Sequence, residues 1–161
     1  MEIRVANASD ASEIIRLYQS SQAATQIPNP KIYPPDILGK ELYSRDAIER
    51  YVAVSAGRII GHGLIEHPNP LSLPLWKGGI EDANNYLIEF GGAFVEPTQM
   101  RKGVYSELLR FRLGVIRGLG AVPVSATWSQ TTHVQRLFVK NGGREVATQR
   151  IPAGLLHLFI F

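Results

Sequence analysis

A strand, a polar loop and a helix that begins at a glycine follow one another from residue 86, and this succession constrains the fold most strongly. Tyr86–Val95 is mainly apolar and predicts a strand, and Gly91 and Gly92 in its middle favour a bulge or a close backbone approach. Pro97–Lys102 is a polar loop, and a helix is expected from Gly103. One face of this helix collects the apolar residues Val104, Leu108, Phe111 and Val115.

The beginning of this helix has the chemistry of an anion site. The N–H groups of a first helical turn have no partner within the helix, and the helix dipole favours negative charge there. Arg101 and Lys102 add two cationic side chains directly before Gly103. A diphosphate is the guest that fits this combination of amides and cations.

The remaining patterns predict an α+β domain. Further strands are expected at Ile3–Ala6, Tyr51–Ser55, Arg58–Glu66, Ala121–Trp128, Arg144–Thr148 and Gly154–Phe161. Further helices are expected after residue 10, from about Asp36 to Arg50, and from Thr131 or Thr132 to about Lys140. His67–Asn85 is predicted to be a long loop. The order implies a mixed, mostly antiparallel sheet of six or seven strands with about four helices.

The first helix has an expected start and an expected end. Ser9 or Asp10 can cap it, and Glu13 follows Asp10 at capping-box spacing. Its apolar stripe consists of Ala11, Ile14, Ile15 and Tyr18. Residues 23–35 contain four prolines, so this helix must stop there.

Composition excludes several classes of protein. The 161 residues suit one domain spanning 1–161, and 45% hydrophobic with 19% charged residues indicates an ordinary globular chain. The absence of cysteine excludes disulfides, thiolate metal ligands and a cysteine nucleophile. The four histidines share no metal-ligand spacing, so no metal is expected. With no signal pattern and no long apolar run, we expect a cytoplasmic protein without membrane contact.

Two segments resemble the GNAT superfamily of acetyltransferases. The family pattern is approximately LxVxPxxRGKGIGxxLL, and residues 93–109 read AFVEPTQMRKGVYSELL. The matching residues are Val95, Pro97, Lys102, Gly103, Val104, Leu108 and Leu109. A second family landmark, LYxxxGF, is similar to residues 137–143, which read LFVKNGG. The predicted element order also looks like that of the family over nearly the whole chain.

The resemblance implies acetyl-CoA as co-substrate and an amine as acceptor. The implied cofactor-binding residues are Phe94, Val95, Met100, Arg101, Lys102, Gly103, Val104, Tyr105, Ser106 and Phe138. The pantetheine arm of the cofactor would pair with the backbone edges at Phe94–Val95 and Val124–Ala126, where the two strands splay. A backbone N–H near Phe94 would meet the oxyanion.

The sequence departs from the family pattern at three positions. Met100 stands where an arginine or glutamine is usual, and Tyr105 stands where a small residue is usual. Phe138 replaces the tyrosine that often protonates the leaving thiolate. These differences leave open a degenerate member of the family that binds CoA, another ligand or a partner without catalysis.

Two residues are candidates for the general base that the acceptor amine requires. Glu89 lies on the predicted strand six residues before Val95, where some family members carry a catalytic glutamate. His62, between two glycines on the preceding strand, is the second candidate because histidine titrates near neutral pH. A solvent-facing or ion-paired Glu89 and a structural His62 are the alternatives. The general acid is unassigned among Tyr105, Ser129, Thr131 and His133.

The acceptor and the assembly are less constrained by the sequence. Four aromatic residues lie in or beside the expected acceptor region: Tyr33, Tyr43, Trp76 and Tyr86. They suit an acceptor amine that is apolar or cationic, on a small molecule or a peptide. The alternative is that they pack in the core. A homodimer is left open. The net charge of +3 is mild, and the basic group between Arg101 and Arg117 lacks the aromatic interleaving of RNA-binding modules, so nucleic acid is not an expected partner.

Overall fold

The computed structural model describes residues 1–24, 47–82, 84–152 and 154–161. The strands in this part of the chain are β1 (Glu2–Val5), β2 (Ala47–Ser55), β3 (Arg58–Glu66), β4 (Leu87–Val95), β5 (Val122–Trp128), β6 (Arg144–Ile151) and β7 (Gly154–Ile160). The α-helices are α1 (Ala11–Ala24), α3 (Leu73–Gly78), α4 (Val104–Gly118) and α5 (Thr132–Lys140). Two 3-10 turns, η1 (Ala8–Asp10) and η2 (Pro97–Gln99), precede α1 and α4.

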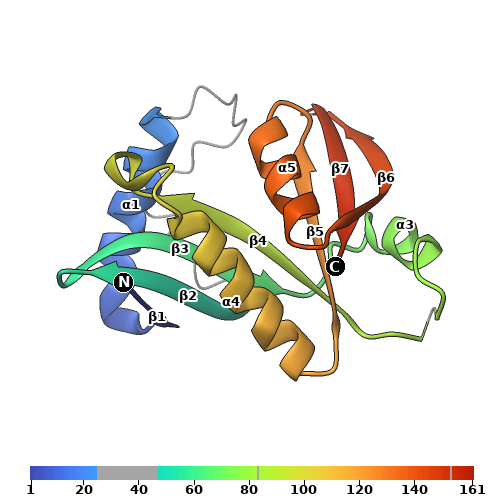
Figure 1. The fold of residues 1–161 in the computed structure, drawn as a ribbon, viewed down its shortest axis with the longest axis horizontal. Helices are drawn as coiled ribbons and strands as arrows, with labels where there is room; N and C mark the ends of the chain where they lie inside the picture. Colours follow the sequence, from blue (N-terminus) through green and yellow to red (C-terminus); the bar gives the residue numbers. More distant parts are fainter. Residues whose placement is uncertain (25–46, 83, 153) are drawn as a thin grey trace. The chain divides into compact units, whose positions relative to one another are not determined.

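The described strands form one seven-stranded sheet in the order β1-β2-β3-β4-β5-β7-β6, shown in Figure 1. Strand β4 pairs with β5 in parallel, whereas the pairs β1–β2, β5–β7 and β6–β7 are antiparallel. This architecture confirms the predicted α+β class and the mixed sheet, and four α-helices lie within the described residues. The chain groups into two compact units: Met1–Ile65 with Gly92–Phe111, and Glu66–Gly91 with Arg112–Phe161.

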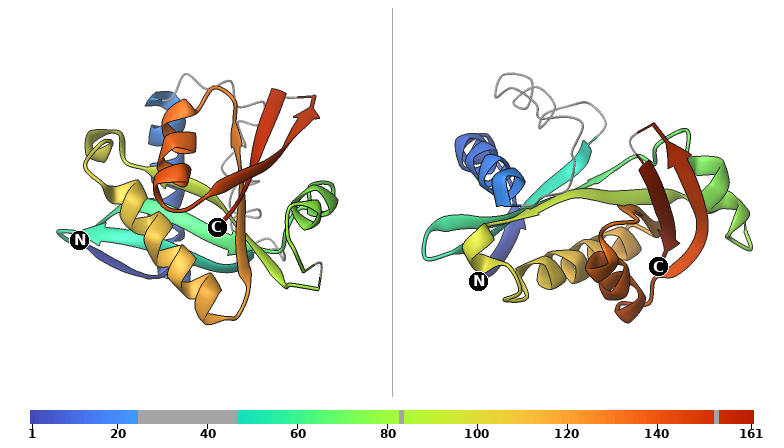
Figure 2. Two further views of the ribbon diagram at one scale, coloured as in Figure 1. Left: turned by 45° about the vertical axis from the view of Figure 1, so that its right-hand side comes forward. Right: turned by 90° about the horizontal axis from the view of Figure 1, so that it is seen from above.

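In the first unit, strands β2 and β3 lie between two helical segments. Helix α1 packs one face through Ile14, Leu17 and Tyr18, which contact Val52 and Ile59. The right-hand view of Figure 2 shows α1 on one side of these strands and the first turns of α4 on the other. Burying apolar side chains on both faces accounts for the consecutive buried residues Tyr51, Val52 and Ala53 in β2.

In the second unit, a core forms around Trp76, Leu87, Val124 and Leu158. Trp76 has no exposed surface, although the sequence around it is rich in proline and glycine. This burial explains why His67–Asn85, predicted to be a loop throughout, contains helix α3: one helical turn places the indole in the core. Pro74 in the first turn is compatible with this helix because no N–H is needed there.

Two other predictions about local structure need correction. The cap before α1 is Asn7, because Ser9 N–H donates to Asn7 Oδ1 at 2.9 Å and Asp10 accepts from the Asn7 N–H at 2.8 Å. Arg4 holds the same Asp10 carboxylate and lowers its pKa, which favours this arrangement over a box between Asp10 and Glu13.

The prediction of a helix from residue 36 to residue 50 is wrong at its C-terminal end. Residues 47–50 belong to β2, since pairing with β1 extends the strand before Tyr51 and the Arg50 carbonyl accepts the Ala6 N–H at 2.8 Å. Residues 36–46 of that prediction, the prolines at 28–35, Tyr33 and Tyr43 lie outside the described residues.

Gly61 of β3 allows α4 to approach the sheet closely. A Cβ at Gly61 would lie 2.8 Å from Val104 Cγ1 and 2.9 Å from Leu108 Cδ1. Both helical residues are buried and belong to the first two turns of α4. The position of the predicted anion site therefore depends on the absence of a side chain at Gly61 of β3.

We expect Gly61→Ala to lower the free energy of unfolding by about 1–3 kcal/mol, because the added methyl overpacks this contact. Gly114→Ala is the matched control, since Gly114 lies in α4 with no atom within 4 Å of its would-be Cβ. That substitution should stabilise the protein by about 0.5–1 kcal/mol through helix propensity. Urea unfolding of the three proteins measures both changes, and equal effects would contradict the close-approach argument.

Candidate functional site

The loop between β4 and α4 presents backbone amides and cations together. Arg101 and Gly103 have positive φ angles of 63° and 89°, which turn the chain into the helix. The first helical hydrogen bond runs from Glu107 N–H to Gly103 O at 3.0 Å. No described residue accepts a hydrogen bond from the N–H of Val104 or Ser106. The start of α4 therefore has donors available for an anion, and the exposed Arg101 and Lys102 precede it.

An ion pair that the sequence did not reveal holds the start of this loop, at Glu96 directly after β4. Arg16 of α1 contacts the Glu96 carboxylate at 2.7 Å and also donates to Ile59 O at 3.2 Å. The backbone N–H of Glu96 donates to Ile60 O at 2.9 Å. The Glu96 carboxylate, followed by that of Glu13, raises the pKa of Arg16. Because Arg16 and Glu96 are 80 residues apart, no local pattern could have predicted the pair.

Phe94 and Val95, predicted to contact the cofactor, direct their side chains into the core of their unit. The Phe94 ring packs edge-on against Tyr18 at 4.8 Å and parallel to His62 at 6.0 Å between ring centres. Val95 is buried. Their backbone groups, rather than their side chains, are therefore the candidates for binding a ligand.

His62 is a core residue in the structure. Its side chain has no exposed surface, and Nδ1 lies 3.1 Å from the carbonyl oxygen of Gly92. Gly92 has a φ angle of 51°, and a Cβ there would lie 2.9 Å from Leu64 Cδ2. This packing favours a structural role for His62, in which it holds the irregular backbone at Gly92.

Glu89 is the more suitable of the two candidate bases. Its side chain is partly buried, and Oε2 accepts the backbone N–H of Asn69 at 3.0 Å. Burial raises the pKa of Glu89 from 4.5 to about 7; the hydrogen bond from Asn69 lowers it and the nearby charge of Glu66 raises it. A carboxyl group with this pKa exchanges protons readily at neutral pH.

Strands β4 and β5 are paired over only part of their length. Their parallel register covers Leu87–Val122, Ile88–Pro123 and Glu89–Val124 and ends there. The prediction that these strands do not pair fully is confirmed. Beyond Glu89, strand β4 continues to Val95 without a registered partner on β5.

Other predicted residues have structural partners. Phe138 is buried, and its ring packs edge-on against Phe90, Phe159 and Phe161 with centroid distances of 5.3–5.6 Å. Thr131 is also buried and donates to Trp128 O at 2.7 Å. Among the remaining acid candidates, His133 is exposed, and Ser129 and Tyr105 are partly exposed.

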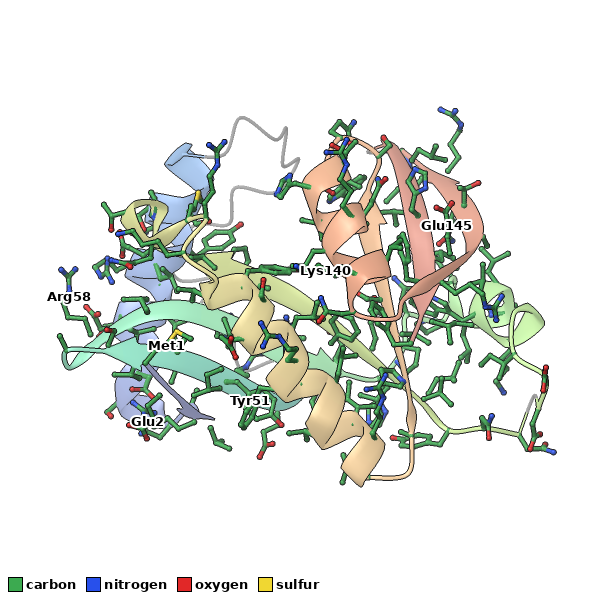
Figure 3. All side chains as sticks on the ribbon, viewed as in Figure 1. Met1, Glu2, Tyr51, Arg58, Lys140 and Glu145 are labelled. Atoms are coloured by element: carbon green, nitrogen blue, oxygen red, sulfur yellow. The ribbon has the colours of Figure 1, made fainter. Side chains whose placement is uncertain are left out.

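A hollow of about 370 Å³ lies on the second unit, and none of its lining residues is a predicted site residue. Its lining consists of Thr132, Gln135, Arg136, Val139, Glu145 and Phe159, and Figure 3 labels Glu145 on β6. Glu145 contacts His157 at 2.9 Å. Three or more His, Asp or Glu side chains do not converge anywhere among the described residues. No described helix is long and apolar enough to cross a membrane.

Comparison with known proteins shows the fold. No family model matches the sequence, and no curated protein matches it either. An N-acetyltransferase from Staphylococcus aureus Mu50 superposes with a TM-score of 0.73 at 18% identity, covering 99% of this chain and 96% of its own. The ribosomal-protein-alanine N-acetyltransferase from Brucella melitensis gives 0.73 at 18%, covering 99% and 98%.

A third solved structure is that of a GNAT family acetyltransferase from Brucella melitensis in complex with acetyl-CoA. Its TM-score is 0.66 at 19% identity, covering 97% of this chain and 94% of its own. The chain therefore has the fold of GNAT acetyltransferases over nearly its whole length, as the sequence resemblance implied.

We expect the Glu89 carboxyl to titrate with a pKa of about 7, measured by carbon-detected NMR. In Glu66→Gln this pKa should fall, because removing a neighbouring negative charge makes ionisation of Glu89 easier. Glu81→Gln, at an exposed position, serves as the control and should leave the Glu89 titration unchanged. A Glu89 pKa near 4.5 in the wild type would contradict the described environment.

Proposed function

We propose that the protein is an acyltransferase that moves an acetyl or other short acyl group from acyl-CoA to an amine. The observation that carries this proposal is the loop from Met100 to Gly103, which leads from β4 into the open N–H groups of α4 within this fold. The acetyl-CoA complex of one structural neighbour supports the choice of ligand. Acetyl-CoA is here a co-substrate, and no metal is required.

The residues of the loop fit a diphosphate. The amides of Val104 and Ser106 can donate to phosphate oxygens, and Arg101 and Lys102 supply positive charge. At Gly103 an added Cβ would meet no atom within 4 Å, so the backbone there is open to close approach. We assign the nucleotide end of acyl-CoA to this loop and its pantetheine arm to the backbone of Phe94 and Val95.

The reaction needs a proton acceptor for the amine. An alkylamine with a pKa near 10.4 is mostly protonated at neutral pH, and only the neutral form attacks a thioester. Glu89 takes this proton, directly or through water. The nitrogen then bonds to the thioester carbonyl carbon, and the carbon–sulfur bond breaks. The proton that the nitrogen sheds on becoming an amide passes to the leaving CoA thiolate, directly or through water. His62 is the second candidate for the base, and its complete burial makes it less accessible to an acceptor.

The acceptor is an amine on a small molecule or a peptide. One structural neighbour is named a ribosomal-protein-alanine N-acetyltransferase, which supports a protein amino group as one acceptor class. The second candidate function is ligand binding without acyl transfer, which Met100, Tyr105 and the buried Phe138 favour. Both functions use the same loop, so they differ in turnover rather than in binding.

A thiol-release assay with acetyl-CoA and a panel of small amines, amino acids and peptide N-termini separates the two functions. Acyl transfer predicts thiol release that requires both the protein and an amine. Binding of CoA without release for any acceptor class would favour the non-catalytic function. Absence of both binding and release would refute the proposal.

Replacing Glu89 by Gln should lower kcat by about 10²–10⁴-fold with little change in the KM for acetyl-CoA, because the general base is lost. The wild-type rate should rise with pH through about 7 as Glu89 loses its proton, and the variant should lack this step. Glu81→Gln, an exposed glutamate in the same unit, is the matched control. An unchanged kcat in Glu89→Gln would move the base elsewhere, with His62 next to be tested.

The altered loop should weaken CoA binding. Met100 lacks the donor of an arginine, and one charge-assisted hydrogen bond contributes roughly 1.5–3 kcal/mol, about ten- to a hundredfold in affinity. We expect tighter CoA binding by calorimetry in the double variant Met100→Arg, Tyr105→Gly. Tyr105→Ala is the control, since glycine itself costs about 1 kcal/mol of helix propensity. If both Tyr105 substitutions weaken binding, the Tyr105 ring contacts the ligand and does not crowd the phosphates.

A further inference from the structure

The hydroxyl of Ser72 joins two elements of the second unit instead of capping its own helix. Ser72 stands at the N-cap of α3, where a serine side chain usually accepts a backbone N–H of the first helical turn. Within the described part of the chain, its side chain accepts no N–H of α3. The hydroxyl, on a residue that is only 3% exposed, donates to Gln149 Oε1 of β6 at 2.7 Å.

Gln149 binds the start of α3 through both atoms of its side-chain amide. Oε1 accepts from Ser72, and Nε2–H donates to Leu71 O at 3.3 Å. An acceptor and a donor used on consecutive residues fix the orientation of the amide as well as its position. Gln149 with Leu71 and Ser72 thus forms a tether between β6 and the start of α3.

The turn that the tether holds presents one backbone amide to Glu89. Asn69 O accepts the N–H groups of Ser72 at 3.0 Å and of Leu73 at 2.9 Å. Asn69 Oδ1 accepts the N–H of Leu71 at 2.9 Å, as in an Asx turn. The N–H of Asn69 itself donates to Glu89 Oε2 at 3.0 Å. A displacement of Leu71 or Ser72 is therefore passed on to the amide that binds Glu89.

The Asn69 amide acts on Glu89 against two opposing influences. Burial and the charge of Glu66 raise the pKa of Glu89, and the hydrogen bond from Asn69 lowers it. Strand β5, the parallel partner of β4, carries no titratable side chain, and Arg112 of α4 binds Gly91 O. The titratable side chains at the end of β3, on α3 and directly before β4 are Glu66, His67, Lys77 and Tyr86.

We propose that Ser72 and Gln149 are positioning residues for Glu89, because they hold the turn before α3 so that the Asn69 amide stays on the Glu89 carboxylate. The inference rests on the proposed function for the role of Glu89 as base, and on the hydrogen bonds for its geometry. Asn69 holds Oε2, and Oε1 is the oxygen assigned to the acceptor amine. A base whose carboxylate is oriented by fixed neighbours meets its substrate in one geometry.

NMR titration of the Glu89 carboxyl tests the tether without any ligand. Ser72→Ala and Gln149→Met should each raise the pKa of Glu89 by about 0.5–1 unit, because a less constrained Asn69 amide stabilises the carboxylate less. The double variant should raise it no further than Gln149→Met alone, since the two side chains act through one contact. These three proteins are the tether variants.

Arg144→Gln is the matched control. It removes a 2.7 Å hydrogen bond from exposed Arg144 of β6 to Gly79 O, at the opposite end of α3, and at physiological salt it should leave the Glu89 titration unchanged. Equal shifts in Arg144→Gln and the tether variants would mean a general loosening of α3 and would overturn the proposal. An unchanged pKa in the tether variants would also overturn it. If Ser72→Ala does not fold, the wild type decides: the Asn69 amide proton should titrate with the midpoint of Glu89, and its failure to do so is the overturning result.

Steady-state kinetics connects the tether to catalysis. With acetyl-CoA and an amine that gives thiol release, kcat of the tether variants should fall about two- to fivefold at pH 7 and recover by pH 9, where Glu89 is ionised in every variant. The KM for acetyl-CoA should not change. A raised pKa without a shift in the rate profile would refute Glu89 as the base and leave the tether in place. If the wild type shows no turnover, the proposed function fails, while the NMR titrations still decide the role of Ser72 and Gln149.

Discussion

The parallel pairing of β4 with β5 ends at Glu89 and Val124, and the candidate site depends on this end. A ladder that continued would use the backbone groups that a bound arm needs. Close to this end, the hydroxyl of Ser125 donates to Phe90 O and the guanidinium of Arg112 donates to Gly91 O. Buried carbonyls without donors are costly, so these two hydrogen bonds make an incomplete sheet stable.

The same strand carries the proposed base at that end and leads into the proposed anion loop. Glu89 is the last paired residue, and its partly buried carboxyl has a pKa of about 7. Further along β4, the φ angle of 51° at Gly92 departs from regular strand geometry, and His62 and Phe94 pack around it. After Val95 the chain enters the loop to α4, whose anchor is the pair Arg16–Glu96. The proposed base, the irregular strand and the proposed anion loop are thus successive parts of one segment.

Local patterns in the sequence predicted most elements because their causes are local. Alternating and periodic apolar residues located the strands around Val52, Leu87 and Val124 and the helix beginning at Val104. Helix α3 was missed, because the burial of Trp76 depends on packing against Leu158 and other residues distant in sequence. The cap at Asn7 was missed because Arg4 and Asp10 must meet in space before it is favoured.

Some residues of the candidate site could be proposed from the sequence alone. Gly103, Arg101 and Lys102 could be proposed because an anion loop has a contiguous sequence. Glu89 could be proposed because the family resemblance implies a catalytic glutamate six residues before Val95. The roles of Arg16, Ser125 and Arg112 depend on contacts across the chain, which no periodicity reveals. The burial of His62 and of Phe138 could not be predicted from residue type alone, since histidine and phenylalanine occur both in hydrophobic cores and in functional sites.

The central claim is that the loop before α4 and the backbone of β4 bind acyl-CoA. A crystal structure of the protein grown with CoA tests it most directly. The account predicts the diphosphate against the N–H groups of Val104 and Ser106, with the arm running along β4 beyond Glu89. CoA bound elsewhere, with this loop and strand unoccupied, would contradict it.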